Sequence, residues 1–327
     1  MANQSRILLI LKYLYNSTDA AHDVSSKDIA RMLESNGITS HDRRTIETDI
    51  DMLISAGHDI CKVHRNGVPT RYRVVERDFD TVELKILIDA VVASRFISPQ
   101  RSSEIIQRLA SMASIADREG LCADVENLVS IKSAIGSNLY IAGDLYRAIV
   151  SKRKVQYQMI DYSIPDMKQI PHRDGHVYIV SPYAMVWKND RYYLIAHEED
   201  RDMIITPRVD RIREVKMLEE QICAMPEDFD IGHFYSLSHK MYSGKECEVT
   251  LLCKNELINH VIDRFGTSFE CISADNNTFK AIVRTSIEPT FFGWLFQYSG
   301  QMKLIEPQEA VDQYNRHRRK TLKSPKD

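Results

Sequence analysis

Side chains that can hydrogen-bond to nucleic acid gather in two short stretches near the amino terminus. The first stretch holds His41, Arg43, Arg44, Thr45 and Thr48. The second holds Lys62, Arg65, Arg71 and Arg73, with no acidic residue between positions 60 and 75. Arginine can hold guanine O6 and N7 with two donors, threonine can contact a phosphate or a thymine methyl, and clustered cations suit phosphates. These nine residues are the candidate DNA-binding set.

Helical patterns surround the first stretch. Apolar residues recur at helical spacing over residues 5–16 and again over 26–35, where Ser25 and Asp28 have the spacing of a capping box. A third helix is predicted to open near residues 39–40 and to end at residues 56–57, with Ile46 and Ile50 on its apolar stripe.

The second stretch reads as a hairpin. Two alternating runs, 60–64 and 70–75, flank Asn66 and Gly67, a pair that tolerates the positive φ angles of a tight turn. Three helices followed by a two-stranded ribbon predict a winged helix-turn-helix. In that fold the third helix enters the major groove and the ribbon follows the phosphates.

The charge balance weakens this prediction. The chain has a formal net charge of −3, and residues 1–75 hold ten basic and nine acidic side chains. Four of the acids, Asp42, Glu47, Asp49 and Asp51, lie at or in the third helix. We expect Asp42 to favour the helix's first turn and Asp49 to pair with an arginine. A winged helix that contacts only protein remains the alternative.

Beyond the ribbon, residues 79–116 have a helical pattern that Ser98 and Pro99 break into two helices. Dimer contacts and ordinary core packing both remain open for this pair. After a helix near 143–152 the period becomes two, and four strands are predicted at 153–161, 176–187, 191–198 and 203–208. Short strands at this spacing favour a small barrel. The strand at 191–198 would fill the barrel with one face and present Tyr193 and His197 on the other.

Here the residues resemble a known family. The run Arg191-Tyr192-Tyr193-Leu194 resembles the signature tripeptide of WYL domains, with tyrosine in place of tryptophan, and residues 207–212 (PRVDRI) resemble the segment that follows it. Ser181-Pro182-Tyr183 fits as well. Residues 43–46 with Asp49, Ile50 and Leu53 are similar to the winged helices joined to such domains. Residues 264–266 and 292–295, with Gly300 and Pro307, are similar to the carboxyl-terminal extension of the same regulators. The chain therefore resembles winged helix-turn-helix transcription regulators with a WYL domain, of the YafY-like group.

The resemblance implies an Sm-like or SH3-like barrel that binds a nucleotide or a short single-stranded nucleic acid, in a homodimer that binds a double-stranded DNA operator. By matching positions it makes Tyr193, Arg208 and Arg211 ligand-binding residues. Strand geometry adds Tyr183 and His197. Guanidinium groups suit phosphate oxygens and an aromatic ring can stack on a base. Two plainer readings stay open, in which Tyr193 is an ordinary barrel tyrosine and Arg208 only pairs with Asp210.

The expected fold class is α+β, in four parts. Residues 1–76 would form the winged helix-turn-helix, 77–138 a helical linker, 139–222 the WYL domain, and 223–327 an α+β extension of ferredoxin-like kind. The function expected is that of a transcription regulator whose DNA binding is modulated by an effector.

Other classes find little support in the sequence. No glycine lies in a GxG or GxSxG motif, and the six cysteines form no CxxC pair, so we expect no catalytic residue, no cofactor and no metal site. A nuclease and an interaction scaffold that binds no DNA are the alternatives kept. The longest apolar stretch, 7–15, is far short of the ~20 residues that span a bilayer. We expect a cytoplasmic protein without membrane contact.

Overall fold

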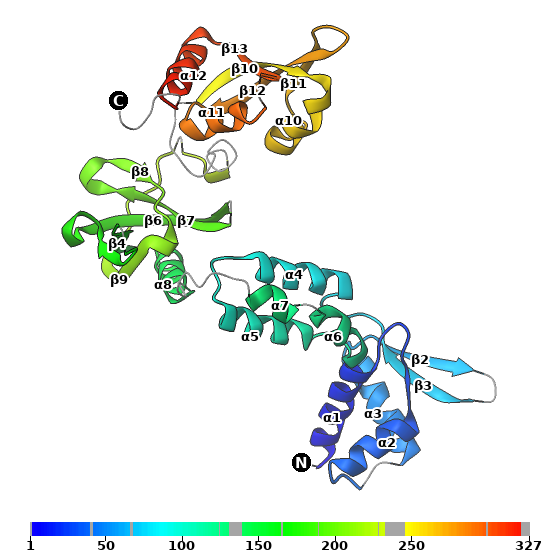
Figure 1. Cartoon of the computed structure of the whole chain (residues 1–327). Coiled ribbons are helices and arrows are strands. Elements are labelled where there is room, and N and C mark those ends of the chain that lie inside the picture. Colours follow the sequence, from blue (N-terminus) through cyan, green and yellow to red (C-terminus); the bar gives the residue numbers. More distant parts are fainter. Residues whose placement is uncertain are drawn as a thin grey trace. The chain divides into compact units, whose positions relative to one another are not determined.

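The computed structural model describes residues 2–39, 42–65, 68–123, 125–130, 139–164, 166–188, 190–227, 229–232, 246–298 and 300–321. Its architecture is mixed α+β with antiparallel sheets, as expected for the class (Figure 1). The chain divides into two compact units, Met1–Ser137 and Asn138–Asp327, and each is described by itself.

Unit 1 begins with three helices and a three-stranded sheet. The elements are α1 (Ala2–Ser17), β1 (Val24–Ser25), α2 (Ser26–Ser35), α3 (Arg43–Ser55), β2 (Ile60–Arg65) and β3 (Val68–Val74). Both β1 and β2 pair with β3 in antiparallel fashion, which confirms the predicted ribbon. Apolar side chains from all three helices and from the sheet share one core, including Leu14, Leu33, Ile50 and Tyr72.

Local capping explains where these helices start. The Ser25 and Asp28 capping box at α2 is present as predicted. Helix α3 begins three to four residues later than predicted, because Asp42 adopts an extended conformation and its carboxylate accepts a hydrogen bond from the Thr45 backbone N–H at 2.7 Å. His41 and the Asn66–Gly67 turn lie outside the described residues.

The other described elements of unit 1 are helices. Its helices are α4 (Thr81–Ala93), α5 (Pro99–Ala110), α6 (Ile115–Cys122) and α7 (Val125–Ser130). The predicted break lies between α4 and α5, where Ser98 caps α5 and Pro99 is its first residue. Buried Leu84, Ile88 and Ile106 form their common core. The two short helices α6 and α7 were not predicted.

Unit 2 opens with helix α8 (Leu139–Val150) and a six-stranded antiparallel sheet. Its strands are β4 (Arg153–Tyr162), β5 (Gln169–Pro171), β6 (Val177–Lys188), β7 (Arg191–Glu198), β8 (Met203–Ile205) and β9 (Ile212–Gln221). The order is β5-β4-β6-β7-β8, with β9 also paired to β4. No pairing joins β8 to β9 in the part of the chain described, so the strand pairing does not close the predicted barrel.

One strand prediction needs correction, and two strands of this sheet, β5 and β9, were not predicted. Strand β8 ends at Ile205 rather than at residue 208, since Pro207 has no N–H to donate to a ladder. Beyond it only an isolated bridge joins Arg208 to Tyr193. Strand β9 was not predicted, because its exposed positions carry charges that hide the alternation.

The carboxyl-terminal part of unit 2 has a four-stranded sheet. Its elements are β10 (Glu246–Lys254), α10 (Ile258–Phe265), β11 (Glu270–Ser273), β12 (Thr278–Ser286), α11 (Pro289–Phe296), β13 (Met302–Glu306) and α12 (Gln308–Thr321). The chain path is βαββαβ with one additional helix at its end, and the sheet order is β11-β12-β10-β13. A ferredoxin-like unit was expected, but its last strand, β13, was not among the predicted elements. Val261, Phe291 and Leu295 of the helices pack on the sheet.

Candidate nucleic-acid interface and effector site

Helix α3 is fixed to α1 by a buried ion pair. The Nε and Nη2 groups of Arg6 donate to the two carboxylate oxygens of Asp49 at 2.5 and 3.0 Å. Their side chains are only 7% and 1% exposed. The hydrogen bond to Asp49 raises the pKa of Arg6 above its ordinary value, against the opposing effect of burial. Asp49 was expected to orient an arginine, and the arginine is one from α1.

The other acids at α3 are also engaged. Asp42 caps the helix, and the hydrogen bond from the Thr45 N–H lowers the pKa of this carboxyl. Glu47 accepts a hydrogen bond from Arg43 Nε at 2.8 Å, and Asp51 pairs with Lys62 Nζ at 2.5 Å. The four acids that weakened the sequence prediction are therefore occupied within unit 1.

What remains on the outer face of α3 is basic and polar. Arg44 and Thr48 are exposed and lie one helical turn apart, and Thr45 is half-buried. The Thr48 hydroxyl donates to the Arg44 carbonyl at 2.9 Å, which orients its methyl and oxygen. Arg44 forms no ion pair within the described residues, so its guanidinium keeps all its donors for another molecule.

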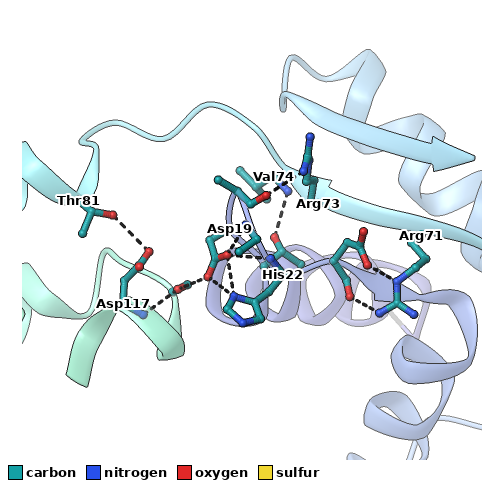
Figure 2. A network of polar contacts seen from close by, with 12 residues as sticks. Asp19, His22, Arg71, Arg73, Val74, Thr81 and Asp117 are labelled. Carbon is teal, nitrogen blue, oxygen red and sulfur yellow. Dashed lines mark hydrogen bonds and ion pairs between the residues drawn. The ribbon is translucent and has the colours of Figure 1, made fainter. Parts of the chain in front are cut away.

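The ribbon residues divide into two kinds. Lys62 lies beside α3 through its ion pair with Asp51. Arg71 pairs with the Asp23 carboxylate and also donates to the Asp23 carbonyl, and Arg73 donates to the Ala20 carbonyl at 3.0 Å (Figure 2). Arg71 and Arg73 thus hold the loop that precedes β1. For Arg65 the structure gives the strand position only.

That loop is the centre of a polar network (Figure 2). The Asp19 carboxylate accepts hydrogen bonds from the Ala21 and His22 N–H groups, from His22 Nδ1 at 2.8 Å, and from the Ser114 hydroxyl at 2.7 Å. Partial burial opposes ionisation of Asp19, but these hydrogen bonds outweigh it and lower its pKa to about 2. Ser114 is the N-cap of α6, so the network joins the loop to the helical part of unit 1.

Two arginines that the sequence analysis did not single out strengthen this junction. Arg77 donates to the Tyr15 and Thr18 carbonyls at 2.7 and 2.5 Å and to the Met112 carbonyl at 3.1 Å. Arg118 donates to the Asn16 side chain at 3.0 Å and to the Ala110 carbonyl at 3.1 Å. Charge-assisted bonds of this kind orient the end of α1 relative to α5 and α6. No local sequence pattern marks such long-range contacts.

In unit 2, Arg208 is held by Asp210. The Nε and Nη2 groups of Arg208 donate to the two Asp210 oxygens at 3.0 and 2.6 Å, and Arg191 lies 3.9 Å from the same carboxylate. The hydrogen bond that Arg208 donates to Asp210 raises the pKa of Arg208. Burial opposes ionisation of Asp210, yet its pKa is lowered by the two arginines. The pairing left open by the sequence is therefore present, and it leaves Arg208 half-buried.

Tyr193 is close to Arg208 but is not on an open surface. An isolated β-bridge joins the two residues. The Tyr193 side chain is buried at 7% exposure, and Phe229 and Ile231 pack against the small cluster that it forms with Ile195. The expectation that this face of β7 is accessible is therefore wrong for the state described.

The remaining predicted ligand residues are spread along the same region. Tyr183 stands at a bulge between Pro182 and Ala184, and its hydroxyl donates to the Ala224 carbonyl at 3.2 Å. His197 lies on the Tyr193 side of β7, with its Nε2 2.9 Å from the Asp202 carboxylate. The Arg211 side chain is exposed. Among the described residues, no group of three or more His, Cys, Asp or Glu side chains is placed to hold a metal ion.

Comparison with known proteins bears on this region. The sequence pattern of the WYL domain matches residues 141–217, from within α8 to within β9. Residues 141–217 form a WYL domain. The tripeptide at 192–194 and the arginines at 208 and 211 lie inside the matched range. The match covers about a quarter of the chain, so it describes this domain rather than the whole protein.

The wider comparisons are weaker. No curated protein matches the sequence. The proteasome accessory factor B/C (PafBC) of Arthrobacter aurescens is similar at 14% identity and a TM-score of 0.29, over 98% of this chain and 49% of that one. A crystal structure of a CRISPR Cas-related protein is similar at 12% identity and a TM-score of 0.21, over 98% and 82%. The chain spans about half the length of the first, and scores this low carry no argument.

No helix in the described ranges combines the length and apolarity needed to cross a bilayer.

Proposed function

We propose that the protein is a DNA-binding transcription regulator with two sites for polyanions. In unit 1, a winged helix-turn-helix places α3 in the major groove and β2–β3 along the phosphates of a double-stranded operator. In unit 2, the WYL domain, with an Sm-like arrangement of its strands, binds a nucleotide or a short single-stranded nucleic acid that modulates operator binding. The proposal includes no catalytic step and no cofactor, and it places the protein in the cytoplasm.

One observation carries the DNA-binding half of the proposal. All four acids at α3 are engaged inside unit 1, whereas Arg44 is exposed one turn from Thr48. Arg6, Arg43 and Lys62 balance three of these acids and Asp42 caps the helix, so Arg44 is the exposed cation of α3 without an ion pair among the described residues, although the net charge of the chain is −3. Buried pairing between Arg6 and Asp49 holds the helix that carries these side chains. Arg65 supplies a phosphate contact, Lys62 supplies one in exchange for its ion pair with Asp51, and Arg71 and Arg73 contribute chiefly through the loop that they hold.

The effector half rests on the WYL match and on the arginines within it. Arg211 is exposed, and Arg208 is held in one orientation by Asp210. Two guanidinium groups three residues apart suit the oxygens of a phosphodiester or a terminal phosphate. Tyr193, Tyr183 and His197 lie on the neighbouring strands and would supply stacking and hydrogen bonds.

A homodimer through α4 belongs to the proposal. Helix α4 is apolar on two sides, yet only Leu84 and Ile88 are buried, whereas Val82 and Ile86 are 68% and 63% exposed. A helix with apolar residues all round is normally covered on both sides. Lys85 and Asp89 stand two residues on either side of Leu87. Lys85 pairs with Asp89 of the same helix, and a twofold axis through Leu87 would bring each of these pairs beside that of the second copy, Lys85 opposite Asp89.

The test uses a duplex taken from upstream of the protein's own gene, or one selected from a random pool. Binding is measured by fluorescence anisotropy at physiological salt for the wild type and for Arg44→Ala. We expect Arg44→Ala to weaken binding by about 1–3 kcal/mol, the value of one bidentate base contact. Lys280→Ala removes the same charge from an exposed position in unit 2 and is the control. Equal affinity of Arg44→Ala and wild type would remove α3 from the interface.

A second assay separates the proposal from its enzymatic rival. Single-stranded and duplex DNA are incubated with the protein and magnesium, and the products are resolved by electrophoresis. Intact DNA is the expected result, and cleavage that follows the protein through purification would favour a nuclease.

A further inference from the structure

A short segment of the chain covers the face of the WYL domain that bears the candidate aromatic residues. We name residues 222–227 and 229–231, which follow β9, the strap. Its first part is hydrogen-bonded to the domain, since the Ile222 N–H donates to the Lys152 carbonyl at 3.2 Å and the Cys223 N–H to the Ser181 hydroxyl at 2.9 Å. The Ala224 carbonyl then accepts a hydrogen bond from the Tyr183 hydroxyl at 3.2 Å.

The second part of the strap is apolar. The Phe229 N–H donates to the Pro226 carbonyl at 3.0 Å, a turn that returns the chain to the domain. Phe229 and Ile231 pack on Tyr193 and Ile195, together with Val186 of β6 and Ile204 of β8. Tyr193 is 7% exposed and Ile195 is fully buried.

The strap therefore contacts both tyrosines of the candidate effector site. Tyr183 is held through its hydroxyl, and Tyr193 is covered by apolar side chains. A base can stack on an aromatic ring only if the ring face is free of other contacts. The charged residues differ, because Arg211 remains exposed and Arg208 half-buried. In this state the candidate phosphate-binding arginines are accessible, whereas the aromatic surface on which a base could stack is covered.

We infer that the strap is a built-in occupant of the effector site, which a nucleotide or short single-stranded nucleic acid displaces when it binds. The inference rests on the proposed function, because it takes its ligand class from it. Phe229 and Ile231 are only half-buried, so the contact is smaller than that of a core residue and suits reversible release.

Displacement would also have a consequence outside the domain. The strap lies between β9 and β10 in the sequence, so its attachment holds the start of the connection between the two sheets against the WYL domain. Release of the strap lengthens the part of the connection that is not attached to the WYL domain, which couples occupancy of the site to the range of positions open to the carboxyl-terminal sheet.

The test compares the full-length wild type with the double variant Phe229→Ala/Ile231→Ala. The probe is a short fluorescein-labelled oligothymidylate, whose binding is followed by anisotropy. If the strap occupies the face about nine-tenths of the time, its loss raises the apparent affinity about tenfold. Phe296→Ala/Ile272→Ala truncates one phenylalanine and one isoleucine that are 57% and 43% exposed, and serves as the matched control. Unchanged or weaker binding by the strap variant overturns the inference.

A second readout does not need the probe to bind. Nitration by tetranitromethane, quantified by mass spectrometry, compares Tyr193 with Tyr140, which is 84% exposed. We expect Tyr193 to react slowly in the wild type and at a rate near that of Tyr140 in the strap variant, with unchanged tryptophan fluorescence. Equal rates for the two tyrosines in the wild type would show that the strap does not cover the site. If nitration behaves as expected but the probe binds neither protein, the strap does cover Tyr193, and the proposal that the effector is a nucleic acid is rejected.

Discussion

Arg6 of α1 and Asp49 of α3 form a bidentate ion pair in the interior of unit 1, with oxygen–nitrogen distances of 2.5 and 3.0 Å. The pair joins the first helix of the chain to the helix that carries the candidate base-contacting residues. Because an unpaired buried charge is costly, neither side chain can be lost alone without penalty. The orientation of Arg44 and Thr48 depends on this contact.

Arg6→Leu is therefore expected to destabilise unit 1 by about 3 kcal/mol, because it leaves the Asp49 carboxylate buried without its partner. The double variant Arg6→Leu/Asp49→Leu should recover most of that loss. Both tryptophans, Trp187 and Trp294, lie in unit 2, so tryptophan fluorescence follows unit 2 during urea unfolding while far-UV circular dichroism follows both units. We expect the change only in the circular dichroism transition. Equal stability of single and double variants would contradict the account.

Asp19→Asn tests the network at the junction in unit 1. The pKa of Asp19 is lowered from 3.8 to about 2. A lowered carboxyl pKa stabilises the fold above the unfolded value, and that stabilisation is lost as the pH falls from about 4 toward 2. Between pH 4 and pH 2 the wild type should therefore lose more stability than Asp19→Asn. The two losses in free energy of unfolding of unit 1 should differ by about 1–2 kcal/mol. Ser26→Ala, outside the network, is the control, and parallel pH profiles for wild type and Asp19→Asn would contradict the assignment.

Substitutions of Arg208 and Arg211 should distinguish a structural role from a ligand-binding role in the WYL domain. Arg211→Ala is expected to weaken oligothymidylate binding about tenfold without altering the unfolding of unit 2, because its side chain is exposed. Arg208→Ala should weaken binding and also lower the stability of unit 2 by about 1–3 kcal/mol, because Asp210 loses a bidentate partner. Tryptophan fluorescence during urea unfolding measures the second effect. A stable Arg208→Ala with full affinity would exclude both roles.

Ile86→Glu tests the dimer. A carboxylate at the centre of the exposed face of α4 would be desolvated in the interface, so we expect a dimeric wild type and a monomeric variant at micromolar concentration. Light scattering coupled to size-exclusion chromatography measures the mass. Ile164→Glu, at a position that is 94% exposed on unit 2, is the matched control and should remain a dimer. A monomeric wild type would contradict the proposed interface.

The sequence predicted the elements whose signals are local. Ser25 and Asp28 predicted the start of α2, and Ser98 and Pro99 predicted the start of α5. The alternation in 191–198 predicted β7. These signals are readable because capping and side-chain alternation depend only on neighbouring residues. The start of α3 was misplaced, since Thr39, Ser40 and Asp42 are all residues that cap helices well.

Contacts between distant residues were not predictable in the same way. Asp49 was recognised as a candidate to hold an arginine, but its partner is 43 residues away in α1. Phe229 and Ile231 belong to no periodic run, and nothing local shows that they cover Tyr193. For the same reason Arg71 and Arg73 were taken as free cations of the ribbon, although they hold the loop at residues 20–23.

Sequence-dependent DNA binding is the central claim, and competition between two duplexes tests it most directly. The wild type is titrated with a selected duplex and with a scrambled duplex of equal length, at several salt concentrations. We predict a preference for the selected duplex of at least about a thousandfold at physiological salt. Both affinities should fall as salt is raised, because phosphate contacts contribute to each. Equal affinity for the two duplexes at every salt concentration would contradict the account.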